Sequence, residues 1–493
     1  RPLLRTALSS PFALAASSRR TFSSSSLKAT EKEIRHHDEE VSLGIKMNLN
    51  FHWIADHADE IQRNIERRNA EGNAHEVRDL YHEYVACRKL VDSIRSGRKK
   101  IAKEMSKKGM AVDVRNSFIE KAKSLKGSLA DAEQKLEASH GHLLEKAMRI
   151  PNMTSEKTPD NKGKLLELIN ATQERDQTSG DGGKDHLLIG EASGLLDFNS
   201  ASKVAGHNHA CFMKSEAALL ELALVNFALS YCSSKGFVPV LTPDVARRTI
   251  VERCGFAPKG KDNLDSQVYQ LEGSDLCLVG TSEIPLAGML ASQLVDESEL
   301  PLKFVAFSHC FRREAGGSGA GLYRMHQFSK VEMFGFTTPS ESDNLLEEIL
   351  SIQREIFSLL ELECRVLEMP ATDLGAPAYR KVDIEAWMPG RGSYGELSSA
   401  SNCLDYQTRR LDIRFRPNPN SKAIEDTHTD SPEASRSGKT SYVHTVNGTG
   451  LAIPRTIIAI FEQMYDEDNA CVRIPKALQS YLGGRDRIPV TVS

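Results

Sequence analysis

Arg312 and Glu314 place a fixed cation and a carboxylate two positions apart, at the end of a segment, 302–314, whose pattern predicts a β-strand. Side chains alternate along a strand, so both are expected on one face, roughly 7 Å apart. A Gly-rich loop follows, and 323–336 is predicted as a returning strand, which indicates an antiparallel hairpin. Charged groups are costly to bury without partners, and a bound ligand is one way to supply them.

The returning strand adds an aromatic ring and a second carboxylate. Phe328 and Glu332 are four positions apart and therefore share one face. The alternative is a solvent-exposed sheet face carrying ion pairs. Arg313 would then point from the opposite face, and exposure of both faces is not expected in a domain of this size. Phe328 would also gain nothing from exposure to water.

A third predicted strand, 395–401, carries Glu396 and Ser398 on one face, with Ser399 beside them. A helix is predicted earlier, over 214–233, and the long segment between it and this strand contains both helical and strand patterns. Helices mixed with antiparallel strands predict an α+β fold for the C-terminal part of the chain.

A fourth predicted strand, 442–449, places Asn447 and Thr449 on one face and runs into a helix over 452–464. Arg455 lies in the first turn of that helix, where a cation opposes the helix dipole. A bound anion explains such a residue better than structure alone.

A basic helical hairpin is predicted between Leu80 and Ile150. Apolar residues recur with 3.5-residue spacing in two runs separated by a short turn at Gly109, a pattern typical of an antiparallel coiled coil. Residues 86–126 contain thirteen Lys or Arg against four Asp or Glu, an excess of +9. A solvated helix surface would explain such a run, but the excess at the far end of the hairpin favours a grip on a nucleic-acid phosphate backbone. The residues expected to contact it are Arg98, Lys99, Lys100 and Lys103.

The N-terminal thirty residues differ in composition from the rest. Residues 1–30 contain five Lys or Arg, eight serines and no acidic residue. This composition is typical of a mitochondrial or plastid transit peptide, with a plain disordered tail as the alternative. We expect a helical arm over 48–150, a linker over 151–183 with a short helical stretch near 165–172, and a larger domain over 184–493.

Bulk composition excludes several classes of protein. The 493 residues carry a formal charge of −4, so the whole chain is not a general polyanion binder. The nine cysteines form no CxxC pair, which disfavours a zinc or dithiol site. The longest apolar stretch, 217–229, is interrupted by Glu221 and Asn226 and is too short to span a bilayer, so no membrane partner is expected.

Seven segments in order resemble the motifs of class II aminoacyl-tRNA synthetases, and within that class of seryl-tRNA synthetases. Any one motif is weakly specific, but the ordered set is highly specific and covers about residues 48–484. The leader favours the mitochondrial form of the family. The segments are Gly236–Pro243, Thr281–Glu283, Phe311–Glu314, Met325–Glu332, Glu396–Asn402, Asn447–Arg455 and Tyr481–Gly484.

The resemblance implies an antiparallel sheet that binds ATP with Mg²⁺. Arg312 would hold the α-phosphate and Arg455 the far phosphates, and with Glu314 they would form the catalytic set. Phe328 would stack on adenine, whose amino group Glu314 would orient. The same resemblance assigns further ATP contacts to Met325, Leu397 and Ser398, and the metal to Glu396 and Ser399.

L-serine would occupy the same surface. The resemblance implies that Thr281 and Glu283 hold the amino group while Glu332 and Thr449 contact the hydroxyl; Ser282, Arg312 and Asn447 complete the serine contacts. Alanine lacks the hydroxyl and would leave buried polar groups unpaired, which supports strong discrimination. The family further implies tRNA(Ser) as partner, a homodimer and, with the leader, the mitochondrial matrix.

The sequence departs from the seryl pattern in one loop. The loop 315–322 is about three residues shorter than in the usual seryl form and lacks its Arg-Asp-Thr-Arg stretch. In the family this loop touches the acceptor end of the tRNA. A binding paralogue that kept the fold but lost catalysis would show degraded motifs. Here Arg312, Glu314, Glu332, Glu396 and Arg455 are all present, which favours the enzyme. Without the resemblance, the chain would be described as an α+β nucleotide-binding protein with a coiled-coil arm.

Overall fold

The computed structural model describes residues 45–107, 109–176, 183–206, 209–256, 267–314, 321–418 and 440–490. The predicted transit peptide lies outside these residues, as do residues 315–320 of the shortened loop. The chain divides after Ile45, and its second unit, Lys46–Ser493, contains every element described below.

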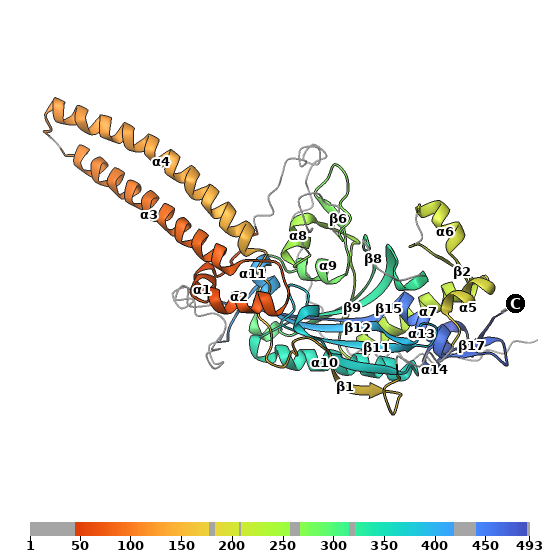
Figure 1. The fold of residues 1–493 in the computed structure, drawn as a ribbon. Helices are drawn as coiled ribbons and strands as arrows, with labels where there is room; N and C mark the ends of the chain where they lie inside the picture. Colours follow the sequence, from red (N-terminus) through yellow and green to blue (C-terminus); the bar gives the residue numbers. More distant parts are fainter. Residues whose placement is uncertain are drawn as a thin grey trace, which may run out of the picture. The chain divides into compact units, whose positions relative to one another are not determined.

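Two long antiparallel helices form the predicted hairpin, α3 (Ala74–Met105) and α4 (Val112–Ala147) (Figure 1). Asn73 caps α3, since its side-chain oxygen accepts the backbone N–H of Glu76 at 3.0 Å. Val91, Leu129 and Ala132 form a buried cluster between the two helices. The 3.5-residue spacing therefore correctly identified both helices and the seam between them.

The base of the hairpin packs on two short helices, α1 (Phe51–Asp56) and α2 (Ala58–Arg67). Arg68 follows α2 and is buried. Its guanidinium donates to the carbonyls of Ala378 at 2.9 Å and Gly375 at 2.6 Å, in the loop before one of the central strands. Burial lowers the pKa of Arg68 to about 10, and these carbonyl contacts fix the arm base to the sheet domain.

An eight-stranded sheet forms the centre of the larger domain, in the order β1-β10-β11-β12-β15-β9-β8-β4. Every neighbouring pair is antiparallel except β4 with β8, which is parallel. This sheet, with the helical arm, confirms the predicted α+β class. The strands are β1 (Lys164–Ile169), β4 (Val238–Leu241), β8 (Leu302–Phe311), β9 (Gln327–Thr337), β10 (Cys364–Glu368), β11 (Arg380–Met388), β12 (Ser393–Leu404) and β15 (His444–Ala452).

Three helices cover the sheet and build its core: α7 (Ser215–Ser234), α10 (Ser342–Leu359) and α13 (Ile453–Gln463). In Figure 1, α10 runs below β11 and β12, and it packs closely against β15. Gly448 of β15 permits that approach, because a Cβ there would lie 2.3 Å from Ile349 of α10.

Among the described residues, α7 is one helix whose length and hydropathy would suffice to cross a membrane. Its apolar composition has a simpler explanation. Leu220, Leu224 and Ala228 are fully buried in the core of the sheet domain, so α7 is apolar because it packs there.

The segment predicted as a linker, 151–183, contains a strand where a short helix was expected. Lys164–Ile169 forms β1, which pairs with β10 at the edge of the sheet. The helical prediction near 165–172 is therefore wrong. A short apolar run does not distinguish helix from strand by periodicity, and pairing with an existing sheet edge decides the outcome.

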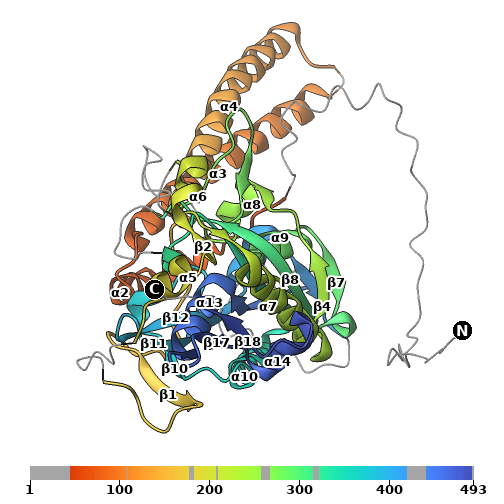
Figure 2. The ribbon, with the colours of Figure 1, turned by 90° about the vertical axis from the view of Figure 1, so that its right-hand side faces the viewer.

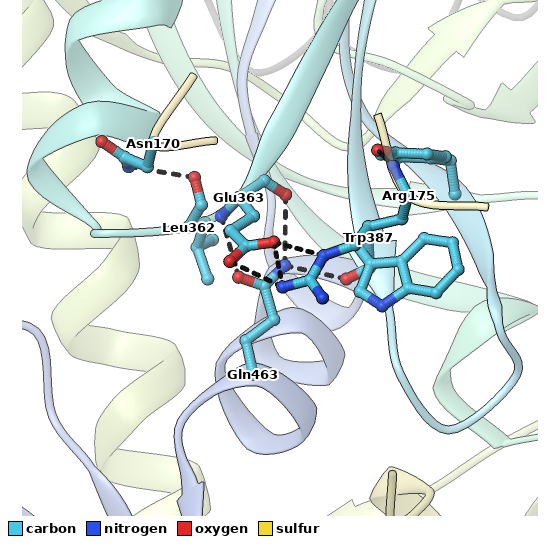
Figure 3. A network of polar contacts seen from close by, with 7 residues as sticks. Asn170, Arg175, Leu362, Glu363, Trp387 and Gln463 are labelled. Atoms are coloured by element: carbon cyan, nitrogen blue, oxygen red, sulfur yellow. Dashed lines mark hydrogen bonds and ion pairs between the residues drawn. The ribbon is translucent and has the colours of Figure 1, made fainter. Parts of the chain in front are cut away.

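Polar contacts hold the chain that follows β1 against the same edge (Figure 3). Arg175 forms a bidentate ion pair with Glu363, with Nε–Oε2 and Nη2–Oε1 distances of 3.0 Å. Gln463 accepts the N–H of Glu363 at 2.8 Å and donates to the carbonyl of Trp387 at 2.8 Å. The end of α13 is thereby tied to β10 and β11.

The smaller elements surround the sheet (Figures 1 and 2). They include the helices α5 (His186–Ala192), α6 (Phe198–Ala205), α8 (Arg248–Arg253), α9 (Glu283–Gly288), α11 (Tyr406–Leu411) and α14 (Lys476–Gln479), the 3-10 turns η2 (Glu297–Glu299), η3 (Gly321–Tyr323), η4 (Pro339–Glu341), η5 (Ala371–Asp373) and η6 (Ser480–Leu482), and the strands β2 (Leu196–Asp197), β3 (Phe212–Met213), β5 (Val245–Arg247), β6 (Leu276–Leu278), β7 (Leu294–Asp296), β13 (Arg414–Arg416), β14 (Ser441–Tyr442), β16 (Tyr465–Asp466), β17 (Cys471–Arg473) and β18 (Arg487–Pro489).

Candidate active site

A pocket opens over the central strands of the sheet. It gathers side chains from β9, β12, β15, the first turn of α13 and the ends of the loop between β8 and β9. Most residues predicted to bind ATP line it: Arg312, Glu314, Met325, Phe328, Glu396, Leu397, Ser399 and Arg455, together with Thr449, Leu322, Tyr323, Lys330, Ala452 and Pro454.

Arg312 and Glu314 reach the pocket by a different route from the one expected. β8 ends at Phe311, so neither residue belongs to the strand, and period-two alternation does not apply to them. Glu314 has a φ of 45°, in the left-handed region. The Arg312 guanidinium lies over the Phe328 ring at 5.2 Å from its centroid, and Glu314 forms a 3.1 Å ion pair with Arg324. The expected strand geometry is wrong, but both side chains face one pocket.

Along β9 the expected alternation holds. Phe328 and Lys330 line the pocket, and the Lys330 ammonium lies 2.7 Å from the Glu332 carboxylate. Glu332 in turn accepts the hydroxyl proton of Thr449 on β15 at 3.1 Å. Glu332 and Thr449 face each other across the β9–β15 ladder, which explains why they meet.

A β-bulge in β12 changes which residues face the pocket. Glu396 pairs with Glu385 and Ser398 with Ile384, so Leu397 is the extra residue. Glu396 and Ser399 consequently line the pocket together, whereas the Ser398 hydroxyl donates to the backbone carbonyl of Thr449. The predicted shared face of Glu396 and Ser398 is therefore wrong.

Glu396 is held by cations. Arg455 donates to its backbone oxygen at 3.0 Å and lies 3.4 Å from its carboxylate. Burial raises the pKa of Glu396, but Lys381, Arg455, Arg312 and Lys330 outweigh burial and leave the pKa below its ordinary value. Glu396 thus favours its ionised form and lines the pocket with Ser399, and carboxylate and hydroxyl oxygens are donors that suit Mg²⁺.

Asp383 is a further carboxylate next to this pair. It lies directly opposite Ser399 in the β11–β12 ladder. One of its oxygens bonds Lys381 at 2.8 Å, and the other is buried without a hydrogen-bond partner in the described structure. The surroundings of Ser399 are therefore acidic as well as oxygen-rich.

A second cluster lies on the far side of Glu332 and centres on Glu283, the first residue of α9. Glu283 is only 5% exposed, and Gln407 donates to its carboxylate at 2.6 Å. Burial raises the pKa of Glu283 to about 7, and the charge of Glu332 acts in the same direction. Asn447 acts in the opposite direction and lowers the pKa of this carboxyl. Glu283, Asn447 and Glu332 are thus brought together as the sequence predicted.

The two residues before Glu283 are fully enclosed. The Thr281 hydroxyl accepts the Glu283 N–H at 3.3 Å. Ser282 is 0% exposed, and in the described structure its hydroxyl has no hydrogen-bond partner. Neither residue lines the larger pocket, which we call the outer chamber. Both belong to a buried acidic cluster around Glu283, which adjoins the outer chamber through Glu332 and Thr449.

A buried triad supports the edge of the outer chamber. The Nδ1 atom of His186 lies 2.9 Å from Glu462 and 2.8 Å from Asp185, and its Nε2 accepts the N–H of Leu322 at 3.4 Å. The Glu462 carboxylate also accepts the N–H of Gly390 at 2.9 Å. Since these polar atoms satisfy one another, we assign the triad to positioning the turn η3, not to metal binding.

The four predicted tRNA-contacting residues, Arg98, Lys99, Lys100 and Lys103, lie near the end of α3 and are exposed. Nearby cations are already in ion pairs, Arg95 with Glu133 and Lys107 with Glu104. Within the described part of the arm, the four show no ion pair, so their charges face solvent.

Some residues of the site escaped sequence reasoning. Lys330 could have been predicted, since side-chain alternation along the strand places it on the same face as Phe328 and Glu332. Arg324 and Tyr323 follow the loop, where no periodic pattern indicates direction. Gln407 comes from α11, more than one hundred residues after Glu283, and only the folded chain brings the two together.

Two family models match the chain. Residues 49–154 match the seryl-tRNA synthetase N-terminal domain, and residues 267–429 match the tRNA synthetase class II core domain (G, H, P, S and T). A serine–tRNA ligase of Rubrobacter xylanophilus is 39% identical over 438 residues, covering 88% of this chain and 98% of that protein.

The chain belongs to the seryl-tRNA synthetase family. A serine–tRNA ligase of Treponema denticola is 37% identical over 444 residues, again 88% of this chain. The crystal structure of seryl-tRNA synthetase from Pyrococcus horikoshii complexed with ATP superposes with a TM-score of 0.77 at 31% identity, covering 90% of this chain and all of that one. The chain is thus a class II synthetase of the serine–tRNA ligase type, with the fold of that family.

Proposed function

We propose that this protein activates L-serine with ATP to form seryl-adenylate and transfers the seryl group to tRNA(Ser) for mitochondrial translation. One observation carries the proposal: the outer chamber, lined by Arg312, Phe328, Glu396 and Arg455, adjoins the buried acidic cluster around Glu283. Two arginines and a ring suit a nucleotide, and a buried carboxylate suits an ammonium group.

ATP would occupy the outer chamber, as the ATP complex of the Pyrococcus horikoshii relative suggests. Adenine would stack on Phe328, with Glu314 directed to its amino group and Met325 and Leu397 lining the site. Arg312 would contact the α-phosphate, where charge develops when the serine carboxylate attacks. Arg455, at the N-terminal end of α13, would contact the outer phosphates with the helix dipole in support.

Glu396 and Ser399 would hold Mg²⁺, since both line the chamber and Glu396 favours its ionised form. Ser398 would contribute through its backbone, because its hydroxyl is engaged with Thr449. When bound, Mg²⁺ would neutralise charge on the phosphate groups. The serine carboxylate is already ionised, so positioning and charge stabilisation suffice for adenylation.

Serine would bind at the buried acidic cluster around Glu283, next to the outer chamber. Glu283 and Thr281 would contact its ammonium group, and Glu332 with Thr449 its hydroxyl; Ser282 and Asn447 complete the enclosure. The Thr449 hydroxyl donates to Glu332 at 3.1 Å, and both the Glu332 carboxylate and the Thr449 hydroxyl oxygen can still accept the proton of an entering hydroxyl. A substrate without the hydroxyl would forgo these contacts.

The arm would bind tRNA(Ser) through contacts between its exposed cations and the phosphate backbone.

A second copy of the chain would cover the edge strand β4 (Figure 2), where Val238 is 55% exposed and Leu241 87%. Leu219 and Leu222 of α7 are exposed as well. An apolar sheet edge of this kind favours a partner. The composition of residues 1–30 supports delivery to the mitochondrial matrix.

ATP–pyrophosphate exchange with each amino acid in turn tests the activation step. We expect exchange with L-serine and little with alanine or threonine. Failure of serine to support exchange would refute the proposal, and binding of serine without exchange would favour a paralogue that lost catalysis. Fusion of residues 1–40 to a fluorescent protein tests the mitochondrial assignment separately, and a cytosolic signal would refute it.

A further inference from the structure

We propose that Gln407 is a positioning residue that sets the affinity for the amino group of serine, by fixing the carboxylate of Glu283. This inference rests on the proposed function, because it assigns a partner to the residue expected to hold that amino group. Gln407 belongs to α11, outside the segments whose motifs identified the family.

The contacts of Gln407 define its orientation. Its Nε2 donates to Glu283 Oε1 at 2.6 Å, and its Oε1 accepts the hydroxyl proton of Thr445 at 2.8 Å. The oxygen and nitrogen of an amide are distinguished by such a network. Because an ionised carboxylate only accepts hydrogen bonds, the N–H group of the Gln407 amide, and not its oxygen, must face Glu283.

Burial makes these contacts strong. Gln407 and Thr445 are both 0% exposed, and the second N–H of Gln407 points at the carbonyl of Cys254 at 3.4 Å. The Glu283 carboxylate therefore cannot exchange this donor for water. A hydrogen bond to a charged group in such surroundings is among the stronger ones in proteins.

Neutrality of the donor also matters. Glu283 already lies near a cation, Lys330, which is engaged with Glu332 at 2.7 Å. A lysine or arginine at position 407 would neutralise Glu283 and compete with the ammonium group of serine. A neutral amide instead orients the carboxylate and leaves its charge available to the substrate.

Steady-state exchange kinetics of purified full-length variants test the inference. Gln407→Met keeps a similar volume and removes both donor and acceptor. We expect its KM for serine to rise roughly tenfold or more, with the KM for ATP unchanged. Thr445→Val leaves the donor present but unanchored, so its KM for serine should lie between wild type and Gln407→Met.

Thr408→Val is the matched control on the same helix. Thr408 is fully buried and donates to the carbonyl of Val443 at 2.6 Å, but in the described structure its side chain makes no hydrogen bond with Glu283. It should lower the melting temperature as a buried hydrogen-bond loss does, without raising the KM for serine. This separates a local effect on Glu283 from general loosening of α11.

The pH dependence of the KM for serine provides a readout that a purely structural role would not move. The Gln407 hydrogen bond lowers the pKa of Glu283, so its loss should shift the midpoint to higher pH. The charged groups acting on Glu283 are Glu332 and Lys330 of β9, and the thiols that face it are Cys254 after α8 and Cys403 of β12. All of these remain in the variant.

The outcomes separate the inference from the function beneath it. If wild type shows serine-dependent exchange and Gln407→Met matches Thr408→Val in its KM for serine, the inference fails alone. If Gln407→Met does not fold, an unaltered KM for serine in Thr445→Val overturns it equally. If wild type shows no exchange with serine, the proposed function fails and the inference with it.

Discussion

Serine binding should weaken as pH falls from 8 to 6, because Glu283 must be ionised to attract an ammonium group. Burial, reinforced by Glu332, raises the pKa of Glu283 from 4.5 to about 7. About nine tenths of the site is then ionised at pH 8 and about one tenth at pH 6. The KM for serine should accordingly rise roughly tenfold between these values, since apparent affinity scales with the competent fraction.

The assay is ATP–pyrophosphate exchange across this pH range, with the KM for ATP followed as an internal control. Glu283→Gln removes the titrating group, so its KM for serine should be higher than wild type at pH 8 and nearly flat with pH. A wild-type KM for serine that stays constant from pH 6 to 8, or a slope that persists in Glu283→Gln, would refute the reasoning.

The same substitution has a stability consequence of known sign. A carboxyl whose folded pKa is raised binds more protons in the native state, so stability is lost as pH rises from about 4.5 through about 7. The full effect is about 3 kcal/mol above that window. Glu283→Gln should therefore be more stable than wild type at pH 8 by denaturant unfolding, despite its weaker serine binding. If the difference in unfolding free energy between the two proteins is the same at pH 5 and pH 8, the carboxylate of Glu283 is not buried as described.

Three further outcomes follow from the site, the arm and the sheet edge. Arg312→Ala should reduce exchange at least about 10²-fold, as for loss of one transition-state donor, and near-normal exchange would contradict its assignment. Leu241→Asp should shift the protein to monomers in sedimentation velocity, whereas an unchanged dimer would place the interface elsewhere. Neutralising four cations of the arm together should weaken tRNA binding and reduce the slope of log Kd against log salt by up to about 3, while serine-dependent exchange stays intact. The four residues are Arg98, Lys99, Lys100 and Lys103. An unaltered slope would show that they do not contact the phosphate backbone.

Regular periodicity allowed much of the fold to be predicted. The 3.5-residue spacing identified both arm helices, and the hairpin of β8 and β9 followed from two strand patterns around a loop. The strand β1 was missed because its six residues carry a run of leucines that fits either helix or strand. Its pairing partner, β10, lies about two hundred residues later, and local sequence does not carry that information.

The candidate site was predictable in its members more than in its geometry. Period two placed Phe328 and Glu332 correctly, because β9 is regular there. It failed for Ser398, since the bulge at Leu397 inserts an extra residue that no pattern in the segment marks. It failed also for Arg312 and Glu314, which follow the end of β8 and reach the pocket through backbone conformation.

Residues that act through others were beyond sequence reasoning. Gln407, His186 and Glu462 have no spacing relation to the motifs that they support. Their partners are set by the way α11, α5 and α13 pack around the sheet. A polar residue that is buried and fully hydrogen-bonded is recognisable only once its surroundings are known.

A crystal structure with a non-hydrolysable seryl-adenylate analogue would test most directly whether the outer chamber and the buried cluster around Glu283 form one site. We expect the adenine on Phe328, the acyl-phosphate mimic against Arg312, and the seryl hydroxyl between Glu332 and Thr449, with its ammonium group on Glu283. An analogue bound with its seryl group away from Glu283 and Glu332, or with Arg312 and Glu332 facing separate cavities, would contradict the proposed site.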